Sequence, residues 1–79
     1  MAPAPTKEFH IDTDGLPIVG SRWRHHSGRI YVILMITNIG SKDPGKFPVT
    51  AVYQGENGMR WSRPVEVFTS DDAKFTPEA

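Results

Sequence analysis

Cysteine is absent from this 79-residue chain. The chain therefore has neither a disulfide framework nor a thiolate zinc site, and the core of one small domain has to stabilise it unless an oligomer contributes. Long apolar runs are absent too. No segment approaches the roughly 18 to 20 apolar residues that span a membrane, and residues 1–8 lack the apolar centre of a secretory signal. These absences predict a cytoplasmic protein that has no membrane partner.

Net charge is also lacking: the formal charge is zero, because Lys and Arg together number nine and so do Asp and Glu. A neutral chain is not typical of a protein whose whole surface attracts nucleic acid. The charges are nevertheless placed unevenly. No acidic residue lies between Gly15 and Ser41, whereas Arg22, Arg24 and Arg29 do. The sequence therefore leaves open the alternative of a basic surface on one part of the protein.

The most apolar stretch, residues 29–37, is rich in β-branched and aromatic side chains and is bounded by Gly28 and by residues 38–41. This pattern predicts a strand rather than a helix. Alternate strand residues face opposite sides, so the prediction gives two apolar faces, and both need cover. One face lines a small sheet, while the other meets the tail segments, a β-bulge that redirects side chains, or another molecule. The first face carries Tyr31, Ile33 and Met35, and the second carries Ile30, Val32, Leu34 and Ile36.

Shorter strands are predicted on both sides of this stretch, over residues 21–26, 49–54 and 59–62. Gly28 suits a tight turn, and Asn57-Gly58 is typical of a type I′ hairpin turn. Residues 39–48 read as a loop, the strand at 59–62 ends or bulges at Pro64, and residues 65–68 form either a fifth strand or one helical turn.

The predicted fold is a small all-β, SH3-like barrel of about five short antiparallel strands, spanning residues 20–69. Residues 1–19 are expected to be a mostly flexible tail, part of which packs as an extended strip in one alternative. Residues 70–79 are expected to be a flexible acidic tail. The predicted core consists of Trp23, Tyr31, Ile33, Val52, Trp61, Val65 and Phe68.

Three blocks carry a resemblance to a known family: residues 23–31, the Val52-Tyr53 pair, and residues 61–68 with their Trp61-Ser62-Arg63-Pro64 sequence. Together they resemble a family of short bacterial and phage domains of unknown function. Ser27 departs from the family pattern, which usually has lysine there. The resemblance implies a compact β domain, often encoded as a separate small protein, and it implies no chemistry.

Catalysis and metal binding are not indicated. His25 and His26 are adjacent, so they point to opposite faces of a strand and cannot share one metal without a bend. No serine lies in a triad context, and a small barrel has its interior filled by side chains. We therefore expect no enzyme activity, no cofactor and no metal.

Binding is the remaining class of function, and the candidate binding surface consists of Arg22, Arg24, Arg29, Tyr53, Arg60, Trp61 and Arg63. In the first interpretation a protein or peptide binds an aromatic groove that the loop 39–48 shapes beside Tyr53 and Trp61. In the alternative, Arg22, Arg24, Arg29 and Arg60 bind nucleic acid. A purely structural role for Arg24 and Arg63 also stays open, in which they stack on a tryptophan or pair with Glu66 or Asp71. The chain is expected to be a monomer or a weak homodimer.

Overall fold

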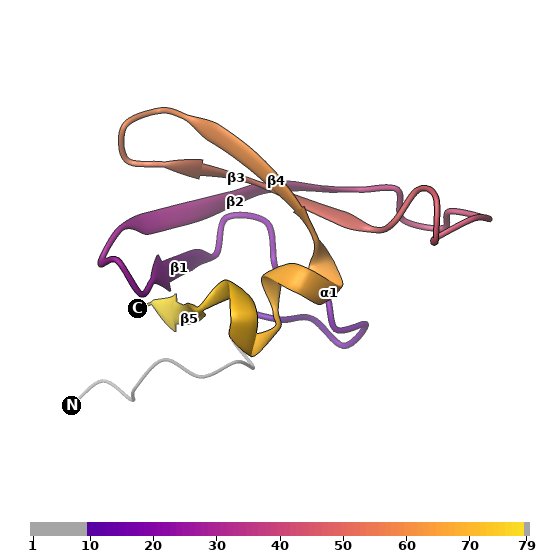
Figure 1. Cartoon of the computed structure of the whole chain (residues 1–79), viewed down its shortest axis with the longest axis horizontal. Helices are drawn as coiled ribbons and strands as arrows, with labels where there is room; N and C mark the ends of the chain where they lie inside the picture. Colours follow the sequence, from indigo (N-terminus) through magenta and orange to yellow (C-terminus); the bar gives the residue numbers. More distant parts are fainter. Residues whose placement is uncertain (1–9, 79) are drawn as a thin grey trace.

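Five antiparallel strands form one curled sheet in the computed structural model, which describes residues 10–78 (Figure 1). The strands are β1 (Arg22–His25), β2 (Ile30–Thr37), β3 (Thr50–Gly55), β4 (Arg60–Pro64) and β5 (Phe75–Glu78), and their order in the sheet is β4-β3-β2-β1-β5. A helical turn, α1 (Val65–Phe68), and a 3₁₀ helix, η2 (Asp71–Ala73), connect β4 to β5. The predicted small all-β, barrel-like fold is confirmed.

Two short hairpin turns connect β1 to β2 and β3 to β4. Gly28 N–H donates to the His25 carbonyl, and Gly58 N–H donates to the Gly55 carbonyl. Both glycines have positive φ, +93° and +85°, and Asn57 does not. Each turn is therefore a three-residue loop closed by a left-handed glycine, and the type I′ geometry predicted at Asn57-Gly58 is wrong because only one of its two residues is left-handed.

A β-bulge in β2 changes which side chains reach the core. The pairing with β3 shifts between Ile33 and Met35, so Leu34 is an extra residue in the ladder. Beyond the bulge, Ile36 packs against the core and Met35 is half exposed. The predicted faces are therefore wrong for these two residues, because the extra residue reverses the alternation from Met35 onward.

The core lies inside the curl of the sheet, where α1 closes it. The Phe68 side chain is fully buried, and its ring centroid lies 5.2 Å from those of Trp23 and Tyr53 and 4.4 Å from that of Phe75. Aromatic rings at these separations pack favourably beyond the apolar area that they bury. The buried cluster consists of Trp23, Ile33, Ala51, Tyr53, Val65 and Phe68.

Four of the seven predicted core residues are buried: Trp23, Ile33, Val65 and Phe68. Tyr31 is partly buried and packs against them. Val52 lies on the opposite face of β3, because it alternates with the buried Ala51 and Tyr53. Trp61 faces the same side as Tyr53, but it lies on an edge strand and is 46% exposed.

The domain is longer at both ends than residues 20–69. The buried His10 lies edge-on to Trp23, at 5.7 Å between ring centroids, and its Nε2 donates to the Glu78 carbonyl. Ile11 and Leu16 also pack against the core, whereas the first nine residues of the predicted tail lie outside the described part of the chain. At the other end β5 pairs with β1, with Trp23 opposite Pro77, so the predicted acidic tail contributes a strand. Between residues 10 and 78, no helix has the length and apolar character needed to cross a membrane.

Candidate functional site

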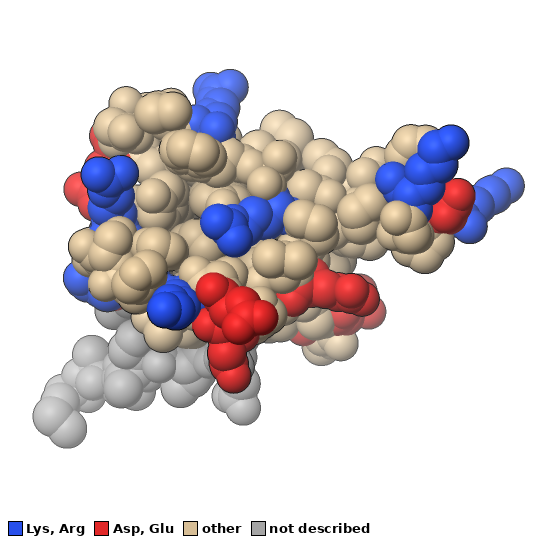
Figure 2. All heavy atoms as spheres, viewed as in Figure 1, with Lys and Arg blue, Asp and Glu red and all other residues tan. Residues whose placement is uncertain are grey.

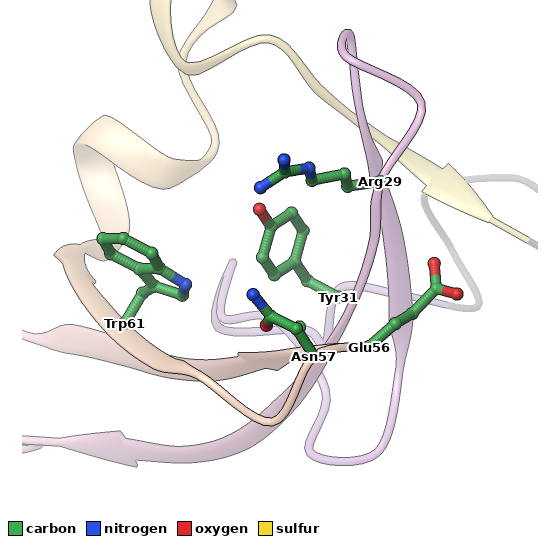
Figure 3. Close-up of a pocket in the computed structure, with 6 residues that line it drawn as sticks. Arg29, Tyr31, Glu56, Asn57 and Trp61 are labelled. Atoms are coloured by element: carbon green, nitrogen blue, oxygen red, sulfur yellow. The ribbon is translucent and has the colours of Figure 1, made fainter.

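An open hollow of about 320 Å³ lies at the end of the sheet where both hairpin turns meet (Figure 3). Arg29 and Tyr31 come from the start of β2, Trp61 comes from β4, and the turn between β3 and β4 supplies the rest. Figure 3 shows Arg29, Tyr31, Asn57 and Trp61 directed into one space. The lining residues are Arg29, Tyr31, Gly55, Glu56, Asn57 and Trp61.

Tyr31 forms the floor of this hollow and is held there by the core. Its ring lies edge-on to the rings of Tyr53 and Phe75, at centroid separations of 5.5 and 5.7 Å. Across the ladder Tyr31 is opposite Gly55, and its ring covers the glycine so closely that a Cβ added there would lie 3.0 Å from Tyr31 Cε1. A side chain at position 55 would therefore require the tyrosine ring to shift by a few tenths of an ångström.

Gly55→Ala is expected to lower the free energy of unfolding by about 1–3 kcal/mol, because the added methyl group overpacks Tyr31 and Asn57. Gly45→Ala is the matched control, since its Cβ would lie 3.7 Å from Asp43 Oδ1, an ordinary contact, and its φ is not left-handed. Urea denaturation of both variants measures the difference. Equal stabilities of the two variants would show that Tyr31 does not need the glycine.

Hydrogen-bond donors converge on the hollow. Asn57 Oδ1 accepts from the Met59 N–H at 3.1 Å, and Figure 3 shows the amide nitrogen of Asn57 pointing into the hollow. The indole nitrogen of Trp61 faces the same space, as does the Arg29 guanidinium. Within residues 10–78, no side chain or carbonyl accepts from these three groups. The hollow therefore offers donors to an acceptor from outside the described chain.

The charge of the site is positive. Arg63 lies on the same face of β4 as Trp61, and its Nε donates to the Tyr53 hydroxyl at 3.0 Å. Burial raises the pKa of Tyr53, although the hydrogen bond from Arg63 opposes that shift. Glu56 is the one carboxylate in the lining, but it points away in Figure 3 and accepts from the Ile30 N–H at 3.2 Å. Arg29 and Arg63 therefore dominate the local charge.

The predicted basic surface is divided between two faces of the sheet. Arg22 and Arg60 lie opposite Val32 and Gln54, on the face away from the core, whereas Arg29 lines the hollow. Arg24 shares that outer face and forms a bidentate ion pair with Glu78, at 2.9 and 3.0 Å. This pair raises the pKa of Arg24 and lowers that of Glu78. In Figure 2 the Lys and Arg side chains are distributed over the visible face, with uncharged residues between them, and do not form one continuous patch.

Tyr53 and the long loop do not take their predicted places. Tyr53 is buried, so it supports the site from beneath and offers only its hydroxyl to Arg63. The loop between β2 and β3 projects from the end of the sheet opposite to the hairpin turns (Figure 1). It therefore does not shape a groove beside Trp61, because an antiparallel meander sends alternate connections to opposite ends.

The outer face carries the apolar residues for which the sequence predicts cover. Ile30, Val32 and Leu34 line a shallow hollow of about 220 Å³, with Arg22, Gln54 and Glu56 around it. Ile36 is not part of this face, because the bulge turns it toward the core.

The two adjacent histidines lie where β1 ends: His25 is the last residue of the strand and His26 begins the turn. Their ring centroids are 4.3 Å apart, because His26 follows the strand and the chain bends there. Burial, followed by the neighbouring His26 and the cations Arg63, Arg29 and Lys74, lowers the pKa of His25. Within the described residues, no group of three or more His, Cys, Asp or Glu side chains is arranged to hold a metal ion.

The stability of the fold is expected to decrease as the pH falls below about 6.5, the ordinary pKa of histidine. His25 has a lowered pKa in the folded state, so the unfolded chain binds its proton first and is favoured on the acid side. His25→Gln should show a smaller loss of Tm between about pH 7 and pH 5 than the wild type. An identical loss in both proteins would assign the pH dependence to other groups.

Sequence reasoning identified Arg29, Trp61 and Arg63 but missed Gly55 and Asn57 as parts of the site. It treated both as turn residues and Tyr31 as core. The signal that was present is the spacing of the two turns, since hairpins of equal geometry at Gly28 and Gly58 bring residues 29–31 and 55–57 to one end of the sheet.

Comparisons of the chain with protein-family models, with curated proteins and with solved structures find no match. The resemblance to small bacterial and phage domains stays a prediction, and the function has to be argued from the site itself.

Proposed function

We propose that this protein is a non-enzymatic binding module that holds a segment of a partner protein in the hollow between Tyr31 and Trp61. The observation that carries the proposal is the convergence of N–H donors from Arg29, Asn57 and Trp61, which have no acceptor among residues 10–78, above an aromatic floor. Binding sites in proteins typically combine apolar walls with a few polar groups of this kind. Exposed tryptophan and arginine are also the residue types that contribute most to binding energy at protein interfaces.

Nucleic-acid binding is the alternative, and the geometry supports it less. Its four arginines do not share one face: Arg29 lines the hollow, and Arg22, Arg24 and Arg60 lie on the outer side of the sheet. Arg24 is also engaged by Glu78. A duplex or single strand needs a continuous basic track, which these residues do not make.

A phage-displayed library of random dodecapeptides, selected on the immobilised protein, tests the proposal. Trp61→Ala is expected to weaken binding of the enriched peptides by about thirtyfold or more, because an aromatic anchor at the centre of an interface contributes at least about 2 kcal/mol. Phe47→Ala is the matched control, since Phe47 is as exposed as Trp61 but lies on the projecting loop. It should leave the affinity unchanged.

Two results would contradict the proposal. The first is a failure of any peptide to enrich, and the second is enrichment of peptides that bind the Trp61→Ala variant as well as the wild type. A gel-shift assay with an oligo(dT) strand at low salt tests the nucleic-acid alternative separately. Retardation of that strand by the wild type, together with no peptide enrichment, would favour the nucleic-acid alternative.

A further inference from the structure

No other strand of residues 10–78 pairs with the outer edge of β4, which lies beside the hollow, and the backbone groups of this edge can be assigned. Gly55 N–H donates to the Met59 carbonyl at 2.9 Å, and Val65 N–H donates to the Val49 carbonyl at 2.8 Å. Because an antiparallel ladder alternates, the backbone groups of Met59, Trp61, Arg63 and Val65 point toward β3. Those of Arg60, Ser62 and Pro64 therefore point outward.

Two N–H donors are thus available on this edge, those of Arg60 and Ser62. No described residue accepts from either of them. The third outward residue, Pro64, has no N–H, so a strand added here ends at that position. Such an edge is a template for an additional strand, and extended peptides commonly bind in this way.

The register of an added strand follows from these assignments. Its residues opposite Arg60 and Ser62 form the backbone hydrogen bonds and point their side chains to the outer face. The residue between them lies opposite Trp61 and points its side chain toward the concave side, where the hollow lies. The next residue on that side, two positions along, faces Arg63.

Charge complementarity indicates which kind of ligand binds the edge of β4. The five residues of β4 include Arg60 and Arg63 and no carboxylate, and Arg29 lies in the adjoining hollow. The Arg24–Glu78 pair is the one ion pair among residues 10–78, so Arg29 and Arg63 have no carboxylate partner there. A second copy of the chain on this edge would bring four arginines together, which opposes self-pairing.

We infer that β4 binds an extended acidic peptide by strand addition, with an Asp or Glu side chain of the peptide entering the hollow between Arg29, Asn57 and Trp61. The carboxylate supplies the acceptor that the three donors lack among residues 10–78. A second acidic residue two positions along pairs with Arg63. This inference rests on the proposed function, because it specifies the ligand and the binding mode of the same site.

Peptides enriched in the dodecapeptide selection provide the test. They are expected to carry Asp or Glu at positions two residues apart. A scan that N-methylates one backbone amide at a time should show a period of two, with binding lost by tenfold or more at alternate positions and retained between them. N-methylation removes one N–H donor, and only the residues whose backbone faces β4 use that donor for binding.

Arg63→Gln is expected to remove the preference for the second acidic position, and glutamine can still hydrogen-bond the Tyr53 hydroxyl. Arg22→Gln is the matched control, because it removes the same charge from the outer face of β1 and should change nothing. Circular dichroism of both variants checks that each is folded.

Four outcomes would overturn the inference. Enriched peptides that tolerate N-methylation at every position would exclude strand addition while leaving the proposed function in place. Enriched peptides without acidic residues would exclude the carboxylate. A dimer in sedimentation velocity that forms through β4 and persists when peptide is added would give this edge to a second copy of the chain instead of a peptide. Failure of any peptide to enrich would remove the proposed function together with the inference.

Discussion

Phe68→Ala is expected to cost about 3–5 kcal/mol of unfolding free energy, the usual loss for a fully buried phenylalanine. A domain of 79 residues has only about 4–12 kcal/mol in total, so the variant should populate unfolded chains under native conditions. The effect is large because one ring contacts Trp23, Tyr53 and Phe75 at the centre of the core. Alanine leaves a cavity that none of these three rings can fill without losing its own contacts in the core.

Urea denaturation followed by near-ultraviolet circular dichroism measures this loss. Val67→Ala is the matched control, because Val67 precedes Phe68 in α1 and is 42% exposed, whereas Phe68 is 0% exposed. The control should change the free energy of unfolding by less than about 0.5 kcal/mol. Similar losses in the two variants would mean that α1 does not close the core.

A chain that ends at Lys74 is expected to lose about 3 kcal/mol or more, a large share of the about 4–12 kcal/mol that a domain of this length has. The truncation removes β5, and with it the ladder to β1 and the Phe75 ring that stacks on Phe68 at 4.4 Å. It also removes Glu78, whose carbonyl accepts from the buried His10. The loss is therefore spread over the sheet, the core and the amino-terminal segment.

Thermal denaturation of the truncated chain, compared with full-length Thr76→Ala, measures the contribution of β5. Thr76 is exposed on the same strand, so its substitution should leave Tm nearly unchanged. A truncated chain as stable as the full-length protein would show that β5 contributes nothing to the fold, as expected for the tail predicted over residues 70–79.

The candidate site was predictable only in part. Arg29, Trp61 and Arg63 were identified because basic and aromatic residues recur in the same blocks of sequence. Tyr31 was assigned to the core, and it does contact the core, but the face that it presents to the hollow depends on Gly55 lying directly beneath it. Cross-strand neighbours of this kind are 24 residues apart in sequence, and no local pattern specifies them.

The division of the arginines also depended on the sheet. Position along a strand gives the relative face of each residue, so Arg22 and Arg24 were correctly placed together. Whether Arg29 shares a surface with them depends on how the turn at Gly28 returns the chain. The structure places it on the other side, and the continuous basic surface is lost.

The amino-acid sequence alone determined the β character of this protein, the turn at Gly28 and the interruption at Pro64, because alternating side chains and Gly or Pro positions act within a few residues. Tertiary structure decided the bulge at Leu34, the pairing of β5 with β1, and the position of Arg29, Asn57 and Trp61 around one hollow. Each of these depends on pairing between segments far apart in the chain, such as Arg22 with Glu78. Backbone hydrogen bonding and the burial of Phe75 supply the free energy for that pairing, and neither is encoded in a local pattern.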